Sequence, residues 1–238
     1  MKIDLKKAHL MGILCWLCWL NSTLANESAE SIWHDETTFL WESRYVDCGR
    51  DDLPQGGLFS SEWVWTQESL SLGLWLGAAD NADYQECNFF AAHSFHIGPV
   101  ELELAYTHLE FLSDDTDDDE LSLVTEFEHH SGWVAAMTSV YSFEAEGSFL
   151  EFSLAHPLTF HTKQLRITPV LMAGIDLGYR TAEHDGLNHI QCMLEAEYAL
   201  SEHWTILAYA AHSVAREDVK REMLGDLFWA GIGLNARF

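Results

Sequence analysis

The chain is poor in basic residues. Among its 238 residues, 12 are lysine or arginine and 38 are aspartate or glutamate, which gives a formal net charge of -26. A protein of this charge is repelled by nucleic-acid phosphates and by anionic lipid surfaces, so no nucleic-acid partner is expected. Aromatic residues nevertheless make up 13% of the sequence, which argues against a disordered acidic chain.

Cysteine and proline are also scarce. Of five cysteines, two lie before residue 26, which leaves Cys48, Cys87 and Cys192. Their number is odd and their spacing matches no zinc motif. We therefore expect free thiols, no metal site and no cofactor, although one disulfide is possible. Of the four prolines, only Pro169 falls inside a predicted strand, where it indicates a bulge or a weakened strand.

Catalytic motifs are missing as well. The sequence has no Gly-x-Ser-x-Gly, His-Glu-x-x-His, phosphate loop or dinucleotide fingerprint. Adjacent Ser/His pairs occur at His93-Ser94 and His212-Ser213, but neighbours on a strand point to opposite faces. The acidic run 114–120 lacks the spacing of a calcium loop, which favours a solvated loop. We therefore expect a protein that is not an enzyme, with a lipid hydrolase as the weaker alternative.

The N-terminal segment is typical of a secretory signal peptide. Lys2, Lys6 and Lys7 precede an apolar stretch at 10–20, and Thr23-Leu24-Ala25 offers small residues for cleavage after Ala25. The apolar stretch is too short for a good spanning helix, and no later run approaches the roughly 18 residues that such a helix needs. An exported chain without a spanning helix is expected to be either a soluble secreted protein or a membrane β-barrel.

The last twelve residues, 227–238, alternate strictly between two faces. Phe228, Leu234 and Phe238 belong to the apolar face, and Asn235 and Arg237 belong to the opposite face. A strand with one face toward lipid and one toward a lumen shows this pattern, and a terminal aromatic is typical of the final strand of an outer-membrane barrel. We expect Phe238, Leu234 and Phe228 to form an assembly signal for the barrel-assembly machinery.

The rest of the chain after residue 25 divides into strand-like segments separated by turn residues. Twelve strands are predicted: 38–47, 57–66, 69–79, 84–96, 99–112, 120–129, 133–144, 148–156, 164–179, 189–199, 203–213 and 227–238. Most have the about 9–11 residues that a tilted membrane strand requires. The sequence therefore predicts one all-β domain over 26–238, an antiparallel transmembrane β-barrel of about twelve strands, with ten or fourteen as alternatives.

Loop lengths and aromatic positions orient this barrel. Inner turns are expected to be short and outer loops long. The predicted inner turns are 66–68, 97–98, 130–132, 157–163 and 200–202, and the predicted outer loops include 48–56, 113–119, 180–188 and 214–226. Two aromatic levels are expected at the membrane interfaces. The inner level is Trp65, Trp133 and Trp204, and the outer level is Tyr45, Phe143, Tyr179 and Phe228.

Short motifs near the start of the predicted barrel carry a family resemblance. Ser43-Arg44-Tyr45-Val46 is followed by Gly49, then by Gln55-Gly56-Gly57 and Gly73-Leu74-Trp75. This order resembles the start of a poorly characterised family of outer-membrane porins from Gram-negative bacteria, over roughly 40–110 and the closing strand. The chain departs from the family at Asp47 and Cys48, where an aromatic residue and an arginine are usual. The resemblance implies a barrel and a pore without a defined substrate.

Alternation also predicts which charged residues face the lumen. The predicted pore-lining residues are Glu42, Arg44, Glu62, Glu101, Glu103, Glu126, Glu128, Arg166, Asp176, Glu195 and Glu197, and Glu151 and Arg237 share the inward pattern. An acid-rich wall with few bases favours cations over anions. Twelve strands lie between small barrels filled by side chains and large barrels with aqueous channels.

These observations predict a narrow passive pore in the bacterial outer membrane that passes small solutes and prefers cations. Its expected partners are outer-membrane lipids, the assembly machinery, and small solutes or cations. One alternative is a non-conducting structural or adhesive barrel that acts through acidic outer loops. The other is a soluble secreted β-protein.

Overall fold

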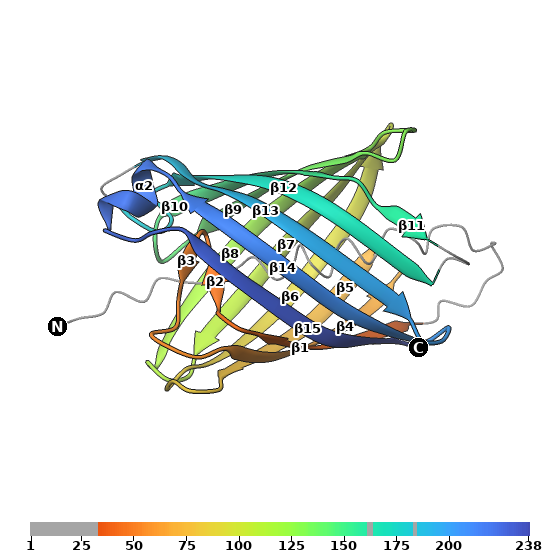
Figure 1. Cartoon of the computed structure of the whole chain (residues 1–238), viewed down its shortest axis with the longest axis horizontal. Coiled ribbons are helices and arrows are strands. Elements are labelled where there is room, and N and C mark those ends of the chain that lie inside the picture. Colours follow the sequence, from red (N-terminus) through yellow and green to blue (C-terminus); the bar gives the residue numbers. More distant parts are fainter. Residues whose placement is uncertain (1–32, 161–163, 183–184) are drawn as a thin grey trace.

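The computed structural model describes residues 33–160, 164–182 and 185–238, so the predicted signal peptide lies outside the described residues. The chain forms a closed antiparallel barrel (Figure 1), which confirms the predicted fold. Its wall consists of β1 (His34–Glu42), β4 (Leu58–Gln67), β5 (Leu70–Ala79), β6 (Gln85–Ile97), β7 (Val100–Phe111), β8 (Thr116–Glu128), β9 (Val134–Ser142), β10 (Gly147–Ala155), β12 (Leu165–Leu177), β13 (Asp185–Ala199), β14 (Trp204–Ala215) and β15 (Leu227–Arg237). The short elements are β2 (Val46–Asp47), β3 (Arg50–Asp51), β11 (Leu158–Phe160) and α2 (Glu217–Arg221).

Each wall strand pairs with its neighbours in the sequence, and β1 pairs with β15 to close the barrel. The backbone of Phe238 continues this closing pair, because Asp35 N donates to Phe238 O at 3.1 Å. The connections 68–69, 98–99, 129–133 and 200–203, and the described residues 156–160 and 164 between β10 and β12, lie at the same end as Phe238, termed the inner end. The connections 43–57, 80–84, 112–115, 143–146 and 216–226, and the described residues 178–182 between β12 and β13, lie at the outer end.

Four strand boundaries differ from the prediction by four or five residues: β1 begins at His34 and ends at Glu42, β8 begins at Thr116 and β13 begins at Asp185. β1 ends at Glu42 instead of residue 47, and the following segment folds into the barrel. β8 begins at Thr116, so most of the acidic run is strand and not a solvated loop. The run stays extended because β7 pairs with it, and because Asp119 accepts hydrogen bonds from Tyr106 at 2.6 Å and contacts His108 at 2.8 Å. Pairing with a neighbouring strand thus overrides the low strand propensity of aspartate.

Pro169 lies within a continuous β12, and the register shift falls between Gly174 and Ile175 instead of at the proline. The carbonyl of Pro169 accepts from His156 N at 3.2 Å, on the side of β10. In an antiparallel strand the N–H of a residue points to the same side as its carbonyl, and β10 has ended at Ala155. The N–H that proline lacks therefore faces the end of the neighbouring strand, where it is not needed for pairing.

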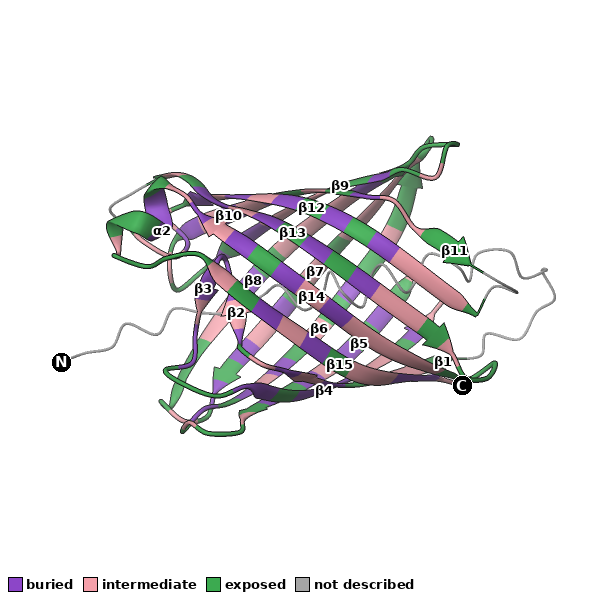
Figure 2. Cartoon of the chain, viewed as in Figure 1, coloured by how far each residue is buried: buried purple, intermediate pink, exposed green. Residues whose placement is uncertain are grey.

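The outer face of the barrel is apolar. Figure 2 shows exposed and buried residues alternating along the wall strands. Trp65, Trp133 and Trp204 are exposed near the inner end, as expected for an interfacial belt. At the outer end Phe143 and Phe228 are exposed, but Tyr45 and Tyr179 are buried in the barrel, so their assignment to the outer belt was wrong. The exposed aromatics Phe59, Phe89 and Tyr141 also lie on the outward face.

Helix makes up little of the fold. Over the described residues, no helix is long and apolar enough to span a membrane.

Cys48, Cys87 and Cys192 are free thiols, and Cys192 is exposed on the outward face of β13. This agrees with the expectation of isolated thiols.

Candidate functional site: the barrel lumen

The inward face of the barrel is rich in buried carboxylates. The buried polar residues include eleven acids and one arginine: Glu42, Asp47, Asp52, Glu62, Glu86, Glu120, Glu126, Glu151, Asp176, Glu195, Asp218 and Arg50. Acids are rarely fully buried unless they are paired, because removing a charge from water is costly. How each acid is accommodated therefore defines the chemistry of the lumen.

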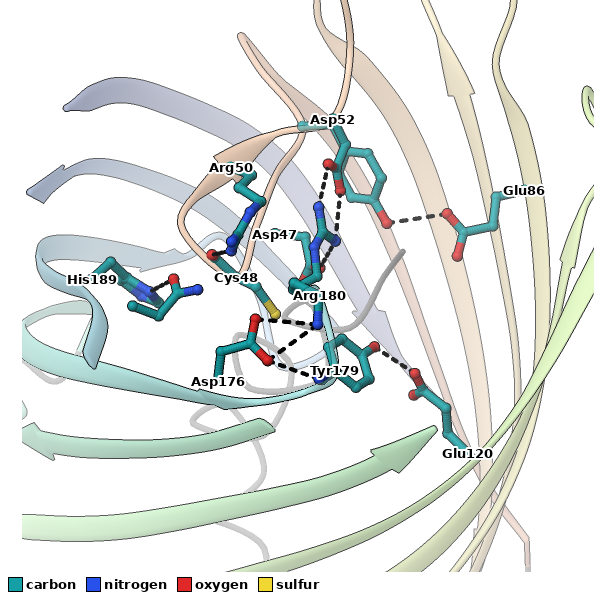
Figure 3. A network of polar contacts seen from close by, with 12 residues as sticks. Asp47, Cys48, Arg50, Asp52, Glu86, Glu120, Asp176, Tyr179, Arg180 and His189 are labelled. Atoms are coloured by element: carbon teal, nitrogen blue, oxygen red, sulfur yellow. Dashed lines mark hydrogen bonds and ion pairs between the residues drawn. The ribbon is translucent and has the colours of Figure 1, made fainter. Parts of the chain in front are cut away.

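The connection 43–57 folds into the outer half of the lumen and carries the small hairpin β2–β3 (Figure 3). Cys48 and Gly49 form its tip, both in the left-handed region with φ of 45° and 73°. This geometry suits a two-residue hairpin turn. A Cβ atom on Gly49 would lie 2.9 Å from Cβ of His189, so the tip rests directly on β13.

Two arginines tie this hairpin to the neighbouring outer connections. Arg180, in the segment 178–182 after β12, contacts Asp47 and Asp52 at 2.7 Å each. Arg50 contacts Asp218 of α2 at 3.1 Å and Glu222 at 2.9 Å. Burial opposes the charged form of Arg180, but the carboxylates of Asp52 and Asp47 outweigh it and raise the pKa of the guanidinium. Three outer connections are thus joined by ion pairs inside the barrel.

Apolar contacts complete the packing of the hairpin segment. Tyr45 and Leu53 belong to a buried cluster with Trp75, Leu109 and Phe111 on the walls of β5 and β7. On the other side of the lumen, the tip residue Cys48 packs against wall residues of β9 and β10, namely Val140 and Phe149. Burial, followed by the nearby Asp47 carboxylate, raises the pKa of the Cys48 thiol. The segment 43–57 therefore crosses the outer half of the lumen from wall to wall.

Tyrosine hydroxyls hold three of the buried carboxylates in this outer half. Tyr45 donates to Glu86 at 3.1 Å, and Tyr84 donates to the same carboxylate. Tyr179 donates to Glu120 at 2.5 Å. Burial, and then the charge of Glu120, raises the pKa of Tyr179, which keeps this hydroxyl protonated as a donor.

The third of these carboxylates is Glu42, at the outer end of β1, which accepts from Tyr209. These neutral donors satisfy carboxylate oxygens without adding positive charge to the lumen.

The inner half of the lumen has a different arrangement. On β7 and β8, Glu101 lies directly opposite Glu126. Across the barrel, Arg166 on β12 binds Glu197 on β13 with contacts of 2.6 Å. Glu103 accepts from Ser94 at 3.0 Å. One side of the inner half is therefore acidic, whereas the side formed by β12 and β13 is neutralised.

The structure places ten of the eleven predicted pore-lining residues on inward positions of wall strands. They are Glu42, Glu62, Glu101, Glu103, Glu126, Glu128, Arg166, Asp176, Glu195 and Glu197. Asp176 lies at the outer end of β12, where it accepts from the backbone N–H of Tyr179 at 2.8 Å and so caps the connection. Arg44 is a correction. It follows the end of β1, its side chain is 46% exposed, and it pairs with Asp51 at 2.6 Å.

The three predicted assembly residues lie on β15 or directly after it. Phe228 and Phe238 are exposed on the outward side, and Leu234 is half-buried. The Phe238 ring stacks on His203, with ring centroids 5.7 Å apart. Their role in assembly stays a prediction.

Sequence reasoning missed the hairpin network. Arg50 and Arg180 were assigned to outer loops, Asp47 was placed at the end of a predicted strand, and Glu86 and Glu120 were not selected as lumen residues. The strand containing Glu86 has apolar residues on both faces, which hides its orientation. Glu120 closes the acidic run, and the run was interpreted as a loop. A local signal for the hairpin exists in Asp47-Cys48-Gly49-Arg50, because a glycine between short polar segments favours a tight turn.

A closed barrel with an apolar outer face and a polar inner face is a membrane-spanning β-barrel. Its fold is that of bacterial outer-membrane porins, which supports a location in the outer membrane. Among solved structures, a KdgM porin matches with a TM-score of 0.58 and 11% identity, covering 85% of this chain and 99% of that chain. A NanC porin matches with a TM-score of 0.55 and 7% identity, covering 85% and 98%.

A KdgM porin in complex with disordered oligogalacturonate matches with a TM-score of 0.57 and 9% identity, covering 86% of this chain and 99% of that chain. No family model matches the sequence. No curated protein matches it either. At these identities the similarity establishes the fold, and the function must be argued from the lumen of this chain.

Proposed function

We propose that the protein is a narrow passive pore of the outer membrane that prefers cations and is constricted at its outer end by the segment 43–57. The observation that carries this proposal is the excess of carboxylates on the inward face of a closed twelve-strand barrel. In a confined space of low dielectric constant, uncompensated acids attract cations and repel anions. The expectation that the chain is not an enzyme stays a prediction.

The charge of the lumen bears on whether this chain could carry oligogalacturonate, the ligand named for one of the similar porin structures. Oligogalacturonate is a polyanion, and a pore that carries it needs positive charge along its path. In this chain Arg166 is engaged by Glu197, and Arg50 and Arg180 are engaged by carboxylates of the outer network. We therefore infer that acidic oligosaccharides are poor solutes here, and that small cations or neutral solutes are better ones.

Planar-bilayer recordings test the pore and its selectivity. Wild-type protein is expected to give conductance steps and to pass K⁺ more readily than Cl⁻. Changing Glu101, Glu103, Glu195 and Glu197 to glutamine should reduce this preference without preventing insertion, because the outward residues are unchanged. The preference should also weaken at 1 M salt, where the Debye length falls to about 3 Å. Steps with anion preference would contradict the proposed selectivity.

The filled outer half of the lumen favours a second candidate, a barrel that does not conduct. Replacing residues 44–55 by a short glycine-serine linker distinguishes the two. If the wild type gives no steps and the shortened variant conducts, the hairpin is a plug and the native barrel is closed. If both conduct and the variant has the larger steps, the hairpin is a constriction in an open pore.

A further inference from the structure

Three polar side chains on one stretch of the lumen wall are buried with unpaired atoms. Both carboxylate oxygens of Glu151, Oε1 of Gln191 and Nε2 of His189 have no hydrogen-bond partner among the described residues. The three residues are 3%, 2% and 0% exposed. Buried polar atoms are nearly always hydrogen-bonded, because leaving one unpaired costs its full desolvation energy. Four unpaired atoms together are therefore an exception that asks for a physical reason.

These side chains share one patch of the inward face, termed the acceptor patch (Glu151, His189 and Gln191). Glu151 on β10 pairs with Gly174 on β12, and Gly174 pairs with His189 on β13. Gln191 follows on the same face of β13. Gly174 has no side chain, and the His189 ring leans over it, since a Cβ there would lie 2.6 Å from Cε1 of His189. The hairpin tip at Gly49 lies against the same histidine.

The hydrogen-bond network fixes the chemical character of the patch. Asn188 Nδ2 donates to Asp218 at 2.9 Å, which leaves Asn188 Oδ1 to accept from His189 Nδ1, also at 2.9 Å. The proton of the imidazole is therefore on Nδ1, and Nε2 carries a lone pair. Gln191 Nε2 donates to Met172 Sδ at 3.3 Å, so its oxygen is the unpaired atom. With Glu151 ionised, every unpaired atom of the patch is an acceptor.

We propose that the acceptor patch binds the ammonium group of an organic cation, with Glu151 supplying the charge and His189 Nε2 and Gln191 Oε1 accepting N–H groups. An ammonium group offers several donors and one positive charge, which matches acceptors beside one carboxylate. A metal ion fits less well, because no cluster of three or more His, Cys, Asp or Glu side chains in the described part of the chain could hold one. This inference rests on the proposed function, since a cation must enter the lumen to reach the patch.

Isothermal titration calorimetry of the purified, detergent-folded barrel with 1,4-diaminobutane tests the site. Glu151→Gln should weaken binding at least about tenfold, the effect typical of losing a hydrogen bond to a charged group. Glu86→Gln is the matched control, because Glu86 is a buried inward acid whose oxygens already accept from Tyr84 and Asn88. Its effect should stay below about threefold. Gln191→Leu should give an intermediate loss, since it removes a neutral acceptor. Heat-modifiable migration confirms that each variant is folded.

Two further ligands separate hydrogen bonding from simple charge attraction. The bis(trimethylammonium) analogue of 1,4-diaminobutane has the same charge but no N–H donors, and should bind more weakly. Equal binding of the analogue, an equal loss in both glutamine variants, or no binding by the wild type would each overturn the proposal. If calcium binds through Glu151 and binds more tightly than the diamine, the ligand of the acceptor patch is a metal ion and not an ammonium group.

Binding and conduction are measured separately, so the two proposals fail separately. A barrel that binds the diamine through Glu151 but gives no conductance steps contradicts the open pore alone. A barrel that conducts cations and shows no Glu151-dependent binding contradicts the acceptor patch alone.

Discussion

At the outer end of the lumen Arg50 and Arg180 are each held by two acidic side chains, whereas at the inner end Glu101 lies directly opposite Glu126. In the first arrangement burial and charge compensation occur together, which orders a segment inside the barrel. In the second, like charges share a wall without an arginine between them, which leaves a negative potential. The comparison shows that one acid-rich sequence can build both a packed mouth and a charged passage.

Removing a charge from the outer network should have the largest effect on stability. Arg180→Ala leaves Asp47 and Asp52 buried without their guanidinium partner, and breaking a buried ion pair costs about 3–5 kcal/mol. Guanidinium-induced unfolding in detergent micelles measures this loss. Arg221→Ala is the control, because its contact with Glu217 is exposed and 3.9 Å long, and such pairs contribute about 0–1 kcal/mol. A similar loss in both variants would mean that the network does not stabilise the fold.

The contact at the hairpin tip can be tested by adding one methyl group. Gly49→Ala should cost more than the about 1–2 kcal/mol of left-handed backbone strain, because the new Cβ also meets His189. Gly98→Ala, at an inner turn with φ of 61° and nothing within 4 Å, should show the strain alone.

Maleimide labelling of Cys48, in a Cys87→Ser/Cys192→Ser background, reports whether the tip has moved. The buried thiol should react slowly in the parent protein and faster after Gly49→Ala. Unchanged labelling together with equal stability losses at both glycines would contradict a tip seated on β13.

At the inner end, two identical chemical changes should have opposite signs. Glu197→Gln removes the charge that pairs with Arg166 and should destabilise the barrel by about 1 kcal/mol, because both side chains are partly exposed. The same unfolding assay at low salt measures this loss.

Glu126→Gln should instead stabilise the barrel by about 0.2–1 kcal/mol, since it relieves a like-charge cross-strand pair with Glu101. The gain should shrink at 1 M salt, because screening weakens the repulsion. Destabilisation by Glu126→Gln would indicate that this carboxylate has an attractive partner. The negative charge of the inner wall would then be compensated.

The wall of the barrel could be predicted from the sequence because its signal is local. Strict alternation in segments such as 100–107 assigns each side chain to one face, and most boundaries follow from turn residues. The hairpin could not be predicted in this way. Asp47 and Arg180 are 133 residues apart, and Arg50 and Asp218 are 168 residues apart. The prediction of a loop for the acidic run 114–120 was wrong for a related reason, because Asp119 is held in a strand by Tyr106 and His108 on β7.

The long sequence separations in the outer network also set an order of events during assembly. The partners of Arg50 lie in and beside α2, just before β15, and β15 must pair with β1 for the barrel to close. The hairpin therefore cannot reach its final position until the C-terminal part of the chain is in place. Until then Arg50 lacks the carboxylates of Asp218 and Glu222, and the nascent mouth is open. Closing the wall and filling the mouth are consequently late, coupled steps, and an intermediate arrested before β15 pairs should be the most permeable form of this protein.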